Sequence, residues 1–338
     1  MKREILTTVV GSYPVPSWLA GAETDSHALE DAITVVLAVQ ARAGIDVVTD
    51  GEVSRFDPSH PETNGMIEYF ICQLSGVDTR LTRLEIEEFR SQAGFQFRKK
   101  PAGIVRDQIG EGTLYLRDDF ERLAKIASLP LKFTITSPYM LAKTLLDVHY
   151  RSFEPMVLDL AEVLRKQVRD IPAEVLQIDE ANLPGSPQDA ALAARAINHI
   201  LSGAEKCGHK AVHLCFGNYG GQTIQKGYWE SLLPFFNSLE CDHLILEFAR
   251  RGSEEIEVFR NLRPEISLGV GVIDIKDNQV ETPEQVARRI EAAIRKLGRT
   301  RVRWVHPDCG FWMLPRSVAD GKMQSLVRGR DLFLGGEA

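Results

Sequence analysis

The chain has 338 residues, of which 44% are hydrophobic and 26% charged, and its formal net charge at pH 7 is −7. These proportions are those of an ordinary globular protein, and the acidic balance argues against a basic nucleic-acid-binding surface. No stretch approaches the roughly 20 apolar residues of a membrane span, and the apolar run near the N-terminus is too short for a signal peptide. The five widely spaced cysteines form an odd set, which favours a reducing, cytoplasmic setting over a disulfide framework.

Short β-rich runs alternate with helical patterns along most of the chain. The expected strands are residues 5–10, 46–49, 131–136, 174–178, 210–214, 243–246, 267–273 and 302–305. The expected helices are residues 27–43, 155–169, 186–207, 229–239, 253–262 and 283–297. Such alternation is typical of parallel βαβ units, and eight strands predict a (β/α)₈ TIM barrel that spans residues 1–338 as a single domain. An open, doubly wound sheet is the alternative that periodicity does not exclude.

Residues 56–130 fit this alternation less well, because Pro-rich and mixed polar runs replace the regular pattern. We interpret them as an excursion between the second and third strands, forming an inserted hairpin or lid. Two later helices have recognisable starts. Ser253 is the expected N-cap of one, and Thr282 followed by Pro283 is expected to begin the other.

Several possible metal ligands follow the expected strands. His213 and Cys215 end one strand two residues apart, so both side chains point the same way. Glu247 ends the next strand, and Cys309 follows the last one. Because active-site groups of such barrels collect at the carboxyl ends of the strands, these four side chains are expected on one rim.

One imidazole, two thiols and one carboxylate form a ligand set that suits zinc. With two thiolates and a carboxylate the centre is negative, which makes it a weak Lewis acid toward water. Coordination instead holds an incoming thiol as the thiolate, which is the nucleophilic form. The ligand set therefore favours alkylation of a thiol over hydrolysis.

Simpler interpretations exist for each residue. A His-x-Cys pair on a strand is common in packed cores, Glu247 could be a solvated loop acid, and Cys309 could belong to a tight turn before Gly310. Buried free cysteines behave as small apolar residues. The remaining three cysteines are accordingly assigned to structure, and they are Cys72, Cys207 and Cys241.

Six segments, in this order, resemble the catalytic barrel of cobalamin-independent methionine synthase. They are residues 7–14 (TTVVGSYP), 46–52 (DVVTDGE), 66–70 (MIEYF), 177–180 (QIDE), 269–274 (GVGVID) and 307–310 (PDCG), joined by the His213, Cys215 and Glu247 contexts. The resemblance spans nearly the whole chain. It implies a zinc-dependent methyltransferase that forms methionine from homocysteine.

The resemblance also implies roles for individual residues. His213, Cys215, Glu247 and Cys309 would bind Zn²⁺. The carboxylates of Glu52 and Asp179 would hold the amino group of homocysteine, and the backbone at Gly11 and Ser12 its carboxylate. A pair of carboxylates suits an ammonium group, and a turn rich in N–H groups suits an anion.

The chain departs from the family pattern in ways that concern the methyl donor. Full-length members have a second barrel that helps to bind polyglutamyl folate. Lys276 stands at the position of the family's proton-donating His, and Thr144 lies near the position of the aromatic residue that stacks on the pterin. Tyr139 or Trp312 are possible substitutes for that aromatic residue. A methyl group on a tertiary amine needs protonation and tight positioning, whereas one on cobalt needs less acid assistance. We therefore expect methylcobalamin or a corrinoid protein as donor in preference to methyltetrahydrofolate.

Three other functions remain as alternatives from the sequence. An alkyl transferase could join an epoxide to a sulfonated thiol cofactor, but carboxylates at Glu52 and Asp179 would repel the sulfonate. A metal-free barrel resembling uroporphyrinogen decarboxylase would need several arginines and no cysteine pair. A non-catalytic zinc- or corrinoid-binding module would not need the two carboxylates together.

Overall fold

A computed structural model of the chain describes residues 4–19, 26–57, 63–92, 98–217 and 227–335. Within them, one sheet has seven parallel strands in the order β1-β10-β9-β8-β7-β6-β4. These strands are β1 (Leu6–Thr7), β4 (Lys132–Thr136), β6 (Val175–Glu180), β7 (His209–Leu214), β8 (His243–Leu246), β9 (Ser267–Ile273) and β10 (Val302–Pro307).

The two edges of this sheet are joined through residues 47 and 48. Thr8 forms a parallel bridge with Val47, and Val48 forms one with Leu131, which directly precedes β4. The backbone carbonyl of Val48 also accepts a hydrogen bond from the Lys132 N–H at 2.8 Å. The segment expected as the second strand therefore closes the ring, and the predicted barrel is confirmed in preference to an open sheet.

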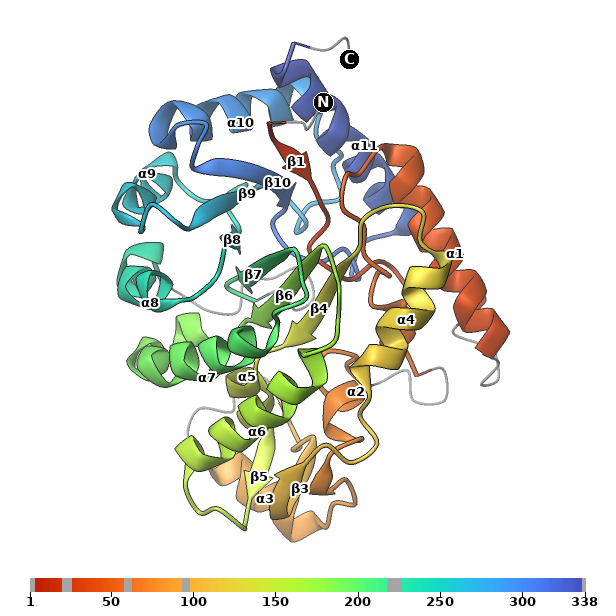
Figure 1. Ribbon diagram of the computed structural model, residues 1–338, viewed down its shortest axis with the longest axis vertical. Helices are drawn as coiled ribbons and strands as arrows, with labels where there is room; N and C mark the ends of the chain where they lie inside the picture. Colours follow the sequence, from red (N-terminus) through yellow and green to blue (C-terminus); the bar gives the residue numbers. More distant parts are fainter. Residues whose placement is uncertain (1–3, 20–25, 58–62, 93–97, 218–226, 336–338) are drawn as a thin grey trace.

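Helices cover the outside of the barrel, as Figure 1 shows. They include α1 (Ser26–Ala43), α5 (Pro138–Ala142), α6 (Phe153–Val168), α7 (Ala190–Gly203), α8 (Leu233–Ser238), α9 (Ser253–Glu257), α10 (Pro283–Leu297) and α11 (Arg316–Phe333). Alternate strand residues such as Val212 and Leu214 are buried in the large apolar cluster beneath these helices. The strands are apolar on this outer face because parallel sheets of this kind are covered.

A smaller apolar cluster fills the inside of the barrel. Its members come from four of the strands and from two segments beside them, and they are Val10, Val47, Val175, Ala211, Ile245 and Trp304. Lys132 shares this interior, with 2% of the residue exposed, and its Nζ donates to the Val9 carbonyl. A cation is thus enclosed below the rim on which the candidate ligands were expected.

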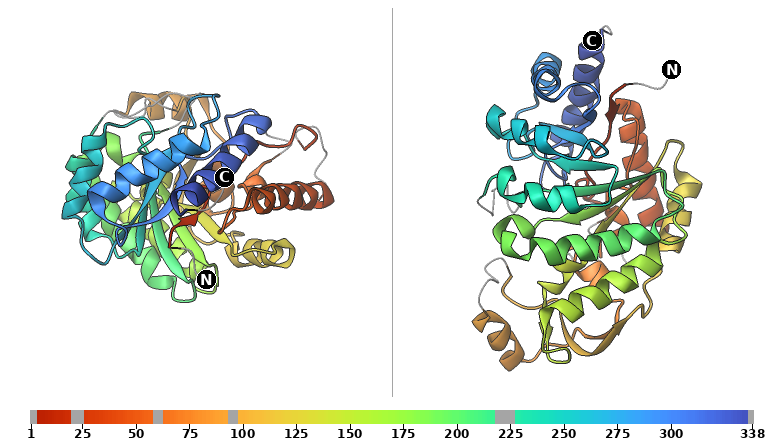
Figure 2. Two further views of the ribbon diagram at one scale, coloured as in Figure 1. Left: turned by 90° about the horizontal axis from the view of Figure 1, so that it is seen from above. Right: turned by 60° about the vertical axis from the view of Figure 1, so that its left-hand side comes forward.

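Residues 56–130 contain helices α2 (Glu68–Ile71), α3 (Arg83–Ser91) and α4 (Leu116–Ile126), and strands β2 (Ser75–Asp78) and β3 (Gly103–Gly110). β2 and β3 pair in the antiparallel sense, and β3 also pairs in parallel with β5 (Leu145–Asp147). Figures 1 and 2 place this small sheet at one end of the long axis of the molecule. Whether the segment acts as a lid stays a prediction.

The two predicted helix starts have different outcomes. Thr282 caps α10 with a capping box, and Pro283 occupies the first turn, as expected. α9 begins one residue earlier than expected, since Gly252 is its N-cap and Ser253 already belongs to the helix. α9 also ends at Glu257 and continues as a 3₁₀ turn, so the expected helix over 253–262 is two short elements.

The C-terminal helix α11 forms polar contacts with the chain next to the N-terminal strand β1. Arg330 of α11 is fully buried, and its Nη1 donates to the Ile5 carbonyl at 3.0 Å and to Asp46 Oδ2 at 2.6 Å. No helix in the described part of the chain combines the length and apolar character needed to cross a membrane.

Candidate functional site

Three of the four predicted metal ligands lie together at the carboxyl ends of β7 and β10. Cys309 Sγ lies 3.6 Å from Cys215 Sγ and 3.8 Å from His213 Nε2. His213 is the penultimate residue of β7 and Cys215 follows the strand, so the two-residue period puts both on one side. Cys309 reaches them from the turn after β10. All three donor atoms lie within 4.8 Å of one another.

The imidazole of His213 is oriented for ligation through Nε2. Its Nδ1 lies 2.8 Å from the Ile245 carbonyl, an acceptor, so Nδ1 carries the proton and the Nε2 lone pair faces the thiols. Metal-binding histidines commonly have such a second hydrogen bond. The donor set and this orientation fit a zinc ion held by His213, Cys215 and Cys309.

Glu247, the fourth predicted ligand, is not part of this group among the described residues. It follows β8 on the same rim and is 4% exposed, but its carboxylate is paired with two cations. Lys276 Nζ lies 3.3 Å from Oε2, and Arg251 Nη1 lies 3.5 Å from Oε1. The sequence therefore predicted correctly that Glu247 lies on the same rim as the thiols. It did not reveal the two cations that pair with its carboxylate.

Asp308 connects the ends of β8 and β10. Its Oδ1 accepts hydrogen bonds from the Phe248 and Ala249 N–H groups, both at 2.9 Å. Burial raises the pKa of Asp308 to about 7, and the nearby charge of Glu247 adds to the shift. These bonds join the residue before Cys309 to the backbone that follows Glu247.

A pair of buried carboxylates lies beside the thiol cluster. Asp179 is 3% exposed and accepts from Gln177 Nε2 at 2.6 Å, while Glu52 accepts from Thr134 Oγ1 at 2.9 Å. Burial raises the pKa of Asp179, whereas the neighbouring His213 lowers it. Burial also raises the pKa of Glu52 to about 7; Arg55 opposes this shift, and Asp179 adds to it. Two carboxylates close enough to influence each other form a site suited to a cation.

The backbone of Glu52 adopts a left-handed conformation with φ of 57°, which is uncommon for a residue other than Gly, Asn or Asp. The Asp50 carboxylate supports it by accepting the Glu52 N–H at 2.9 Å. Arg55 lies behind it, with Nη1 at 3.9 Å from Glu52 Oε1. Glu52 is therefore paired with Arg55 and still lies close enough to Asp179 for the two carboxylates to influence each other.

Gly11 and Ser12 lie against this carboxylate pair and against the turn that carries Cys309. A Cβ added at Gly11 would stand 2.2 Å from Glu52 Oε1, and one at Gly310 would stand 2.0 Å from Ser12 Oγ. The Phe311 N–H donates to the Ser12 carbonyl at 2.8 Å. The two glycines thus allow the first and last βα turns of the barrel to pack side by side.

We expect Gly11→Ala to displace the Glu52 carboxylate, because the added methyl group and Oε1 cannot occupy the same space. Overpacking of this kind costs about 1–3 kcal/mol of unfolding free energy. The temperature of thermal unfolding and the affinity for homocysteine should both fall. A variant with unchanged stability and unchanged acceptor affinity would contradict the contact.

Lys132 belongs to the same electrostatic group and was missed by sequence reasoning. Burial lowers the pKa of its ammonium group to about 7, while the charges of Asp179 and Glu52 act in the opposite direction. The available signal was a single charged residue near the start of the otherwise uncharged strand LKFTIT. Its position lets it balance the charge of the carboxylate pair from below.

The aromatic substitutes for the pterin platform differ in accessibility. Tyr139 is fully buried, and its hydroxyl donates to Asp189 Oδ2 at 2.6 Å, so it offers no stacking face. Thr144 is buried as well. Trp312 is 45% exposed and lies three residues beyond Cys309, which leaves it as the accessible aromatic side chain of this pair.

The other three cysteines lie away from the cluster, and all five are free thiols. Cys241 is buried, Cys207 is partly buried, and Cys72 is exposed. Burial raises the pKa of each of these three thiols. They therefore lack the conditions that make a thiol reactive.

Comparisons with known proteins agree with this arrangement. The family described as the catalytic domain of cobalamin-independent synthase matches residues 5–329. The chain is 29% identical to a methionine synthase of Saccharolobus solfataricus over 96% of this chain and 93% of that protein. It is 30% identical to a methionine synthase of Sulfurisphaera tokodaii over 96% of this chain and 90% of that protein. The solved B12-independent methionine synthase of Shewanella sp. W3-18-1, in complex with selenomethionine, has the same fold, with a TM-score of 0.80, 24% identity and 98% of each chain covered.

Proposed function

This chain belongs to the family of cobalamin-independent methionine synthases and is a methyltransferase of that type, and we propose that it methylates the thiol of homocysteine with the help of zinc. The observation that carries the proposal is the convergence of two kinds of group on one rim. His213, Cys215 and Cys309 offer a soft metal site, and the carboxylates of Glu52 and Asp179 lie beside it.

His213, Cys215 and Cys309 would hold the zinc ion. When bound, the ion supplies one piece of chemistry, which is to keep the acceptor sulfur deprotonated and therefore nucleophilic at neutral pH. The fit rests on the Nε2 of His213 and on the two thiols that it faces.

The acid pair supports an amino acid as the acceptor. Glu52 and Asp179 would bind the ammonium group of homocysteine, and the turn at Gly11 and Ser12 would receive its carboxylate. The related Shewanella enzyme was solved with selenomethionine, an amino acid of the same kind as the expected product. A sulfonated thiol would carry no ammonium group and would face two carboxylates, so it fits this pocket less well.

A methyl-corrinoid is the donor we propose. Lys276, at the position of the family's proton donor, is paired with Glu247, and Tyr139 offers no exposed aromatic face. Both features weaken the case for a donor that must be protonated and stacked. A methylcobalamin methyl group requires neither.

The decisive experiment incubates zinc-loaded protein and homocysteine with methylcobalamin or with methyltetrahydrofolate carrying one or several glutamates. We expect methionine from methylcobalamin at a rate at least tenfold above either folate. Faster turnover with folate would overturn the donor assignment but leave the acceptor assignment intact. No methionine from any donor, with methylation of a sulfonated thiol instead, would overturn the acceptor assignment.

Acceptor binding should depend on pH through Glu52. The ammonium group requires the ionised carboxylate, and the pKa of Glu52 is raised to about 7, so kcat/KM for homocysteine should rise between pH 6 and pH 8. Glu52→Gln should lower kcat/KM and remove the rise near pH 7. A Glu52→Gln profile with the same step would assign that titration to another group.

A further inference from the structure

The first βα turn of the barrel, residues 9–12, begins where β1 stops pairing with β10. β1 ends at Thr7, and the Thr8 N–H still donates to the Val305 carbonyl at 3.2 Å. The carbonyl groups of the next three residues instead accept hydrogen bonds from buried side chains. The first of these donors is Lys132, whose Nζ donates to the Val9 carbonyl from inside the barrel. Side chains from other parts of the ring therefore determine the shape of this turn.

Gln177 and Thr49 hold the other two carbonyl groups. Gln177 Nε2, from β6, donates to the Val10 carbonyl at 2.9 Å. Thr49 Oγ1 donates to the Gly11 carbonyl at 2.8 Å. Both donor residues are fully buried, so solvent does not compete for these two hydrogen bonds.

The direction of each carbonyl group fixes the direction of the next N–H group. A trans peptide unit is planar, with its C=O and N–H pointing in opposite directions, and all described peptide bonds are trans. The Gly11 N–H therefore points away from Gln177, and the Ser12 N–H points away from Thr49. Neither N–H donates a hydrogen bond to another described residue, so both can bind a ligand.

Gln177 also contacts the residue proposed to bind the ammonium group. Its amide nitrogen donates to Asp179 Oδ1 at 2.6 Å as well as to the Val10 carbonyl, and an amide NH₂ has one hydrogen for each bond. The reverse orientation of the amide is excluded because it would place the Gln177 oxygen against two acceptors. One buried side chain thus orients both the Gly11 N–H and the Asp179 carboxylate.

We propose that Thr49 and Gln177 are positioning residues that direct the two N–H groups of the first βα turn toward the carboxylate of the acceptor amino acid. This inference rests on the proposed function, which supplies an amino acid as the acceptor. Backbone donors that are oriented before the ligand arrives bind an anion without the cost of ordering them. Thr49 acts on the carboxylate end alone, whereas Gln177 acts on both ends through its contact with Asp179.

The test compares homocysteine with homocysteamine, which is homocysteine without its carboxylate, using zinc-loaded protein and the more active methyl donor. The wild type should favour homocysteine in kcat/KM. Thr49→Val keeps the shape of the side chain but removes the hydroxyl. It should lower kcat/KM for homocysteine about tenfold, mainly through KM, and that for homocysteamine by less than about twofold. Thr49→Ser retains the hydroxyl and should restore the wild-type preference.

Gln177→Met removes both amide hydrogen bonds without adding charge. The preference for homocysteine should again fall about tenfold, because the Gly11 N–H loses its orientation. Unlike Thr49→Val, this variant should also lower kcat/KM for homocysteamine severalfold, because the Asp179 carboxylate loses its donor. If one of these two variants does not fold, the preference measured in the other decides alone.

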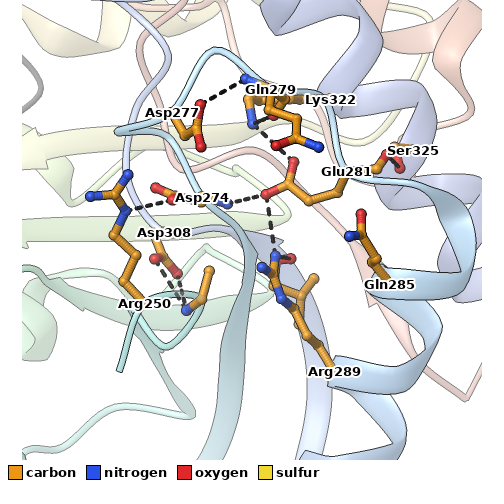
Figure 3. A network of polar contacts seen from close by, with 12 residues as sticks. Arg250, Asp274, Asp277, Gln279, Glu281, Gln285, Arg289, Asp308, Lys322 and Ser325 are labelled. Atoms are coloured by element: carbon orange, nitrogen blue, oxygen red, sulfur yellow. Dashed lines mark hydrogen bonds and ion pairs between the residues drawn. The ribbon is translucent and has the colours of Figure 1, made fainter. Parts of the chain in front are cut away.

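Ser325→Ala and Gln167→Met are the matched controls. The buried Ser325 hydroxyl donates to the Glu281 carbonyl in the network of Figure 3. Gln167 is buried as well, and its Nε2 donates to Glu111 Oε2 at 2.6 Å. Each control loses buried hydrogen bonding outside the acceptor pocket, so kcat/KM for both acceptors should stay within about twofold of the wild type.

Two outcomes separate this inference from the proposed function. Equal losses for the two acceptors in Thr49→Val would overturn the inference alone, since a general effect on the fold does not depend on the carboxylate of the acceptor. An unchanged preference in Gln177→Met would do the same. A wild type that methylates homocysteamine as efficiently as homocysteine would overturn the amino-acid pocket of the proposed function, and this inference with it.

Discussion

Replacing Cys309 with Ser should remove zinc from the purified protein and abolish methyl transfer while the barrel stays folded. A hydroxyl is a poor zinc ligand beside a thiolate, and Cys309 Sγ lies within 4 Å of both other donors. Loss of groups that merely support a ligand already costs 10–100-fold in affinity, so loss of a ligand should exceed about 100-fold. Zinc content by elemental analysis and methionine formation measure the two effects.

Cys72→Ser provides the control, since it is the same chemical change at an exposed thiol away from the site. It should retain both zinc and activity. The metal-free forms of the wild type and of Cys309→Ser should unfold within a few degrees of each other, because rim turns contribute little to barrel stability. Normal zinc content and rate in Cys309→Ser would remove this residue from the metal centre.

Replacing Asp179 with Asn should raise the KM for homocysteine by roughly 10–150-fold with a smaller change in kcat. A hydrogen bond to a charged group contributes about 1.5–3 kcal/mol, and each 1.4 kcal/mol corresponds to tenfold in binding. The amide keeps the shape of the side chain but not its charge. Steady-state kinetics over a range of homocysteine concentrations separate the two parameters.

Glu180→Gln is the matched control, one residue along β6 and on the opposite face of the strand. Glu180 Oε1 accepts the N–H groups of Asn182 and Leu183 at 2.7 and 3.0 Å, and an amide oxygen can accept the same two bonds. The KM for homocysteine should therefore change by less than about twofold. An equal rise in both variants would show that buried charge in general, and not contact with the ammonium group, controls acceptor binding.

The sequence predicted the barrel well where strands pair continuously. It predicted less well the segment with single bridges, the start of one helix and the small second sheet. Residues 46–49 were expected as a strand, yet only Val47 and Val48 bridge to their neighbours. The helix expected over 186–207 begins at Ala190, because two 3₁₀ turns, each containing a proline, precede it. The small sheet of β2, β3 and β5 was missed as a unit, since β5 lies beyond the boundary at residue 130 and pairs back across α4 and β4. Such non-local pairing leaves no periodic signal.

Within the site, residue type and rim position identified the thiol cluster but not the charges around it. His213, Cys215 and Cys309 could be grouped because each follows a strand that ends at the same edge. The pairing of Glu247 with Lys276 could not be foreseen, since it depends on where the loop after β9 turns back toward β8. Residue spacing along the chain specifies the direction of a strand side chain, but it does not specify the partner of a long, flexible one.

The two sides of the site rest on backbone that is joined in different ways. β6, β7, β8 and β9 pair along consecutive residues, and Cys215 follows β7 within this ladder. Glu52 follows a segment that meets the barrel through single bridges at Val47 and Val48. A continuous ladder resists sliding between strands, whereas a single bridge yields more readily. Glu52 can therefore adjust by small movements more readily than His213 and Cys215, which lie at the end of a continuously paired strand.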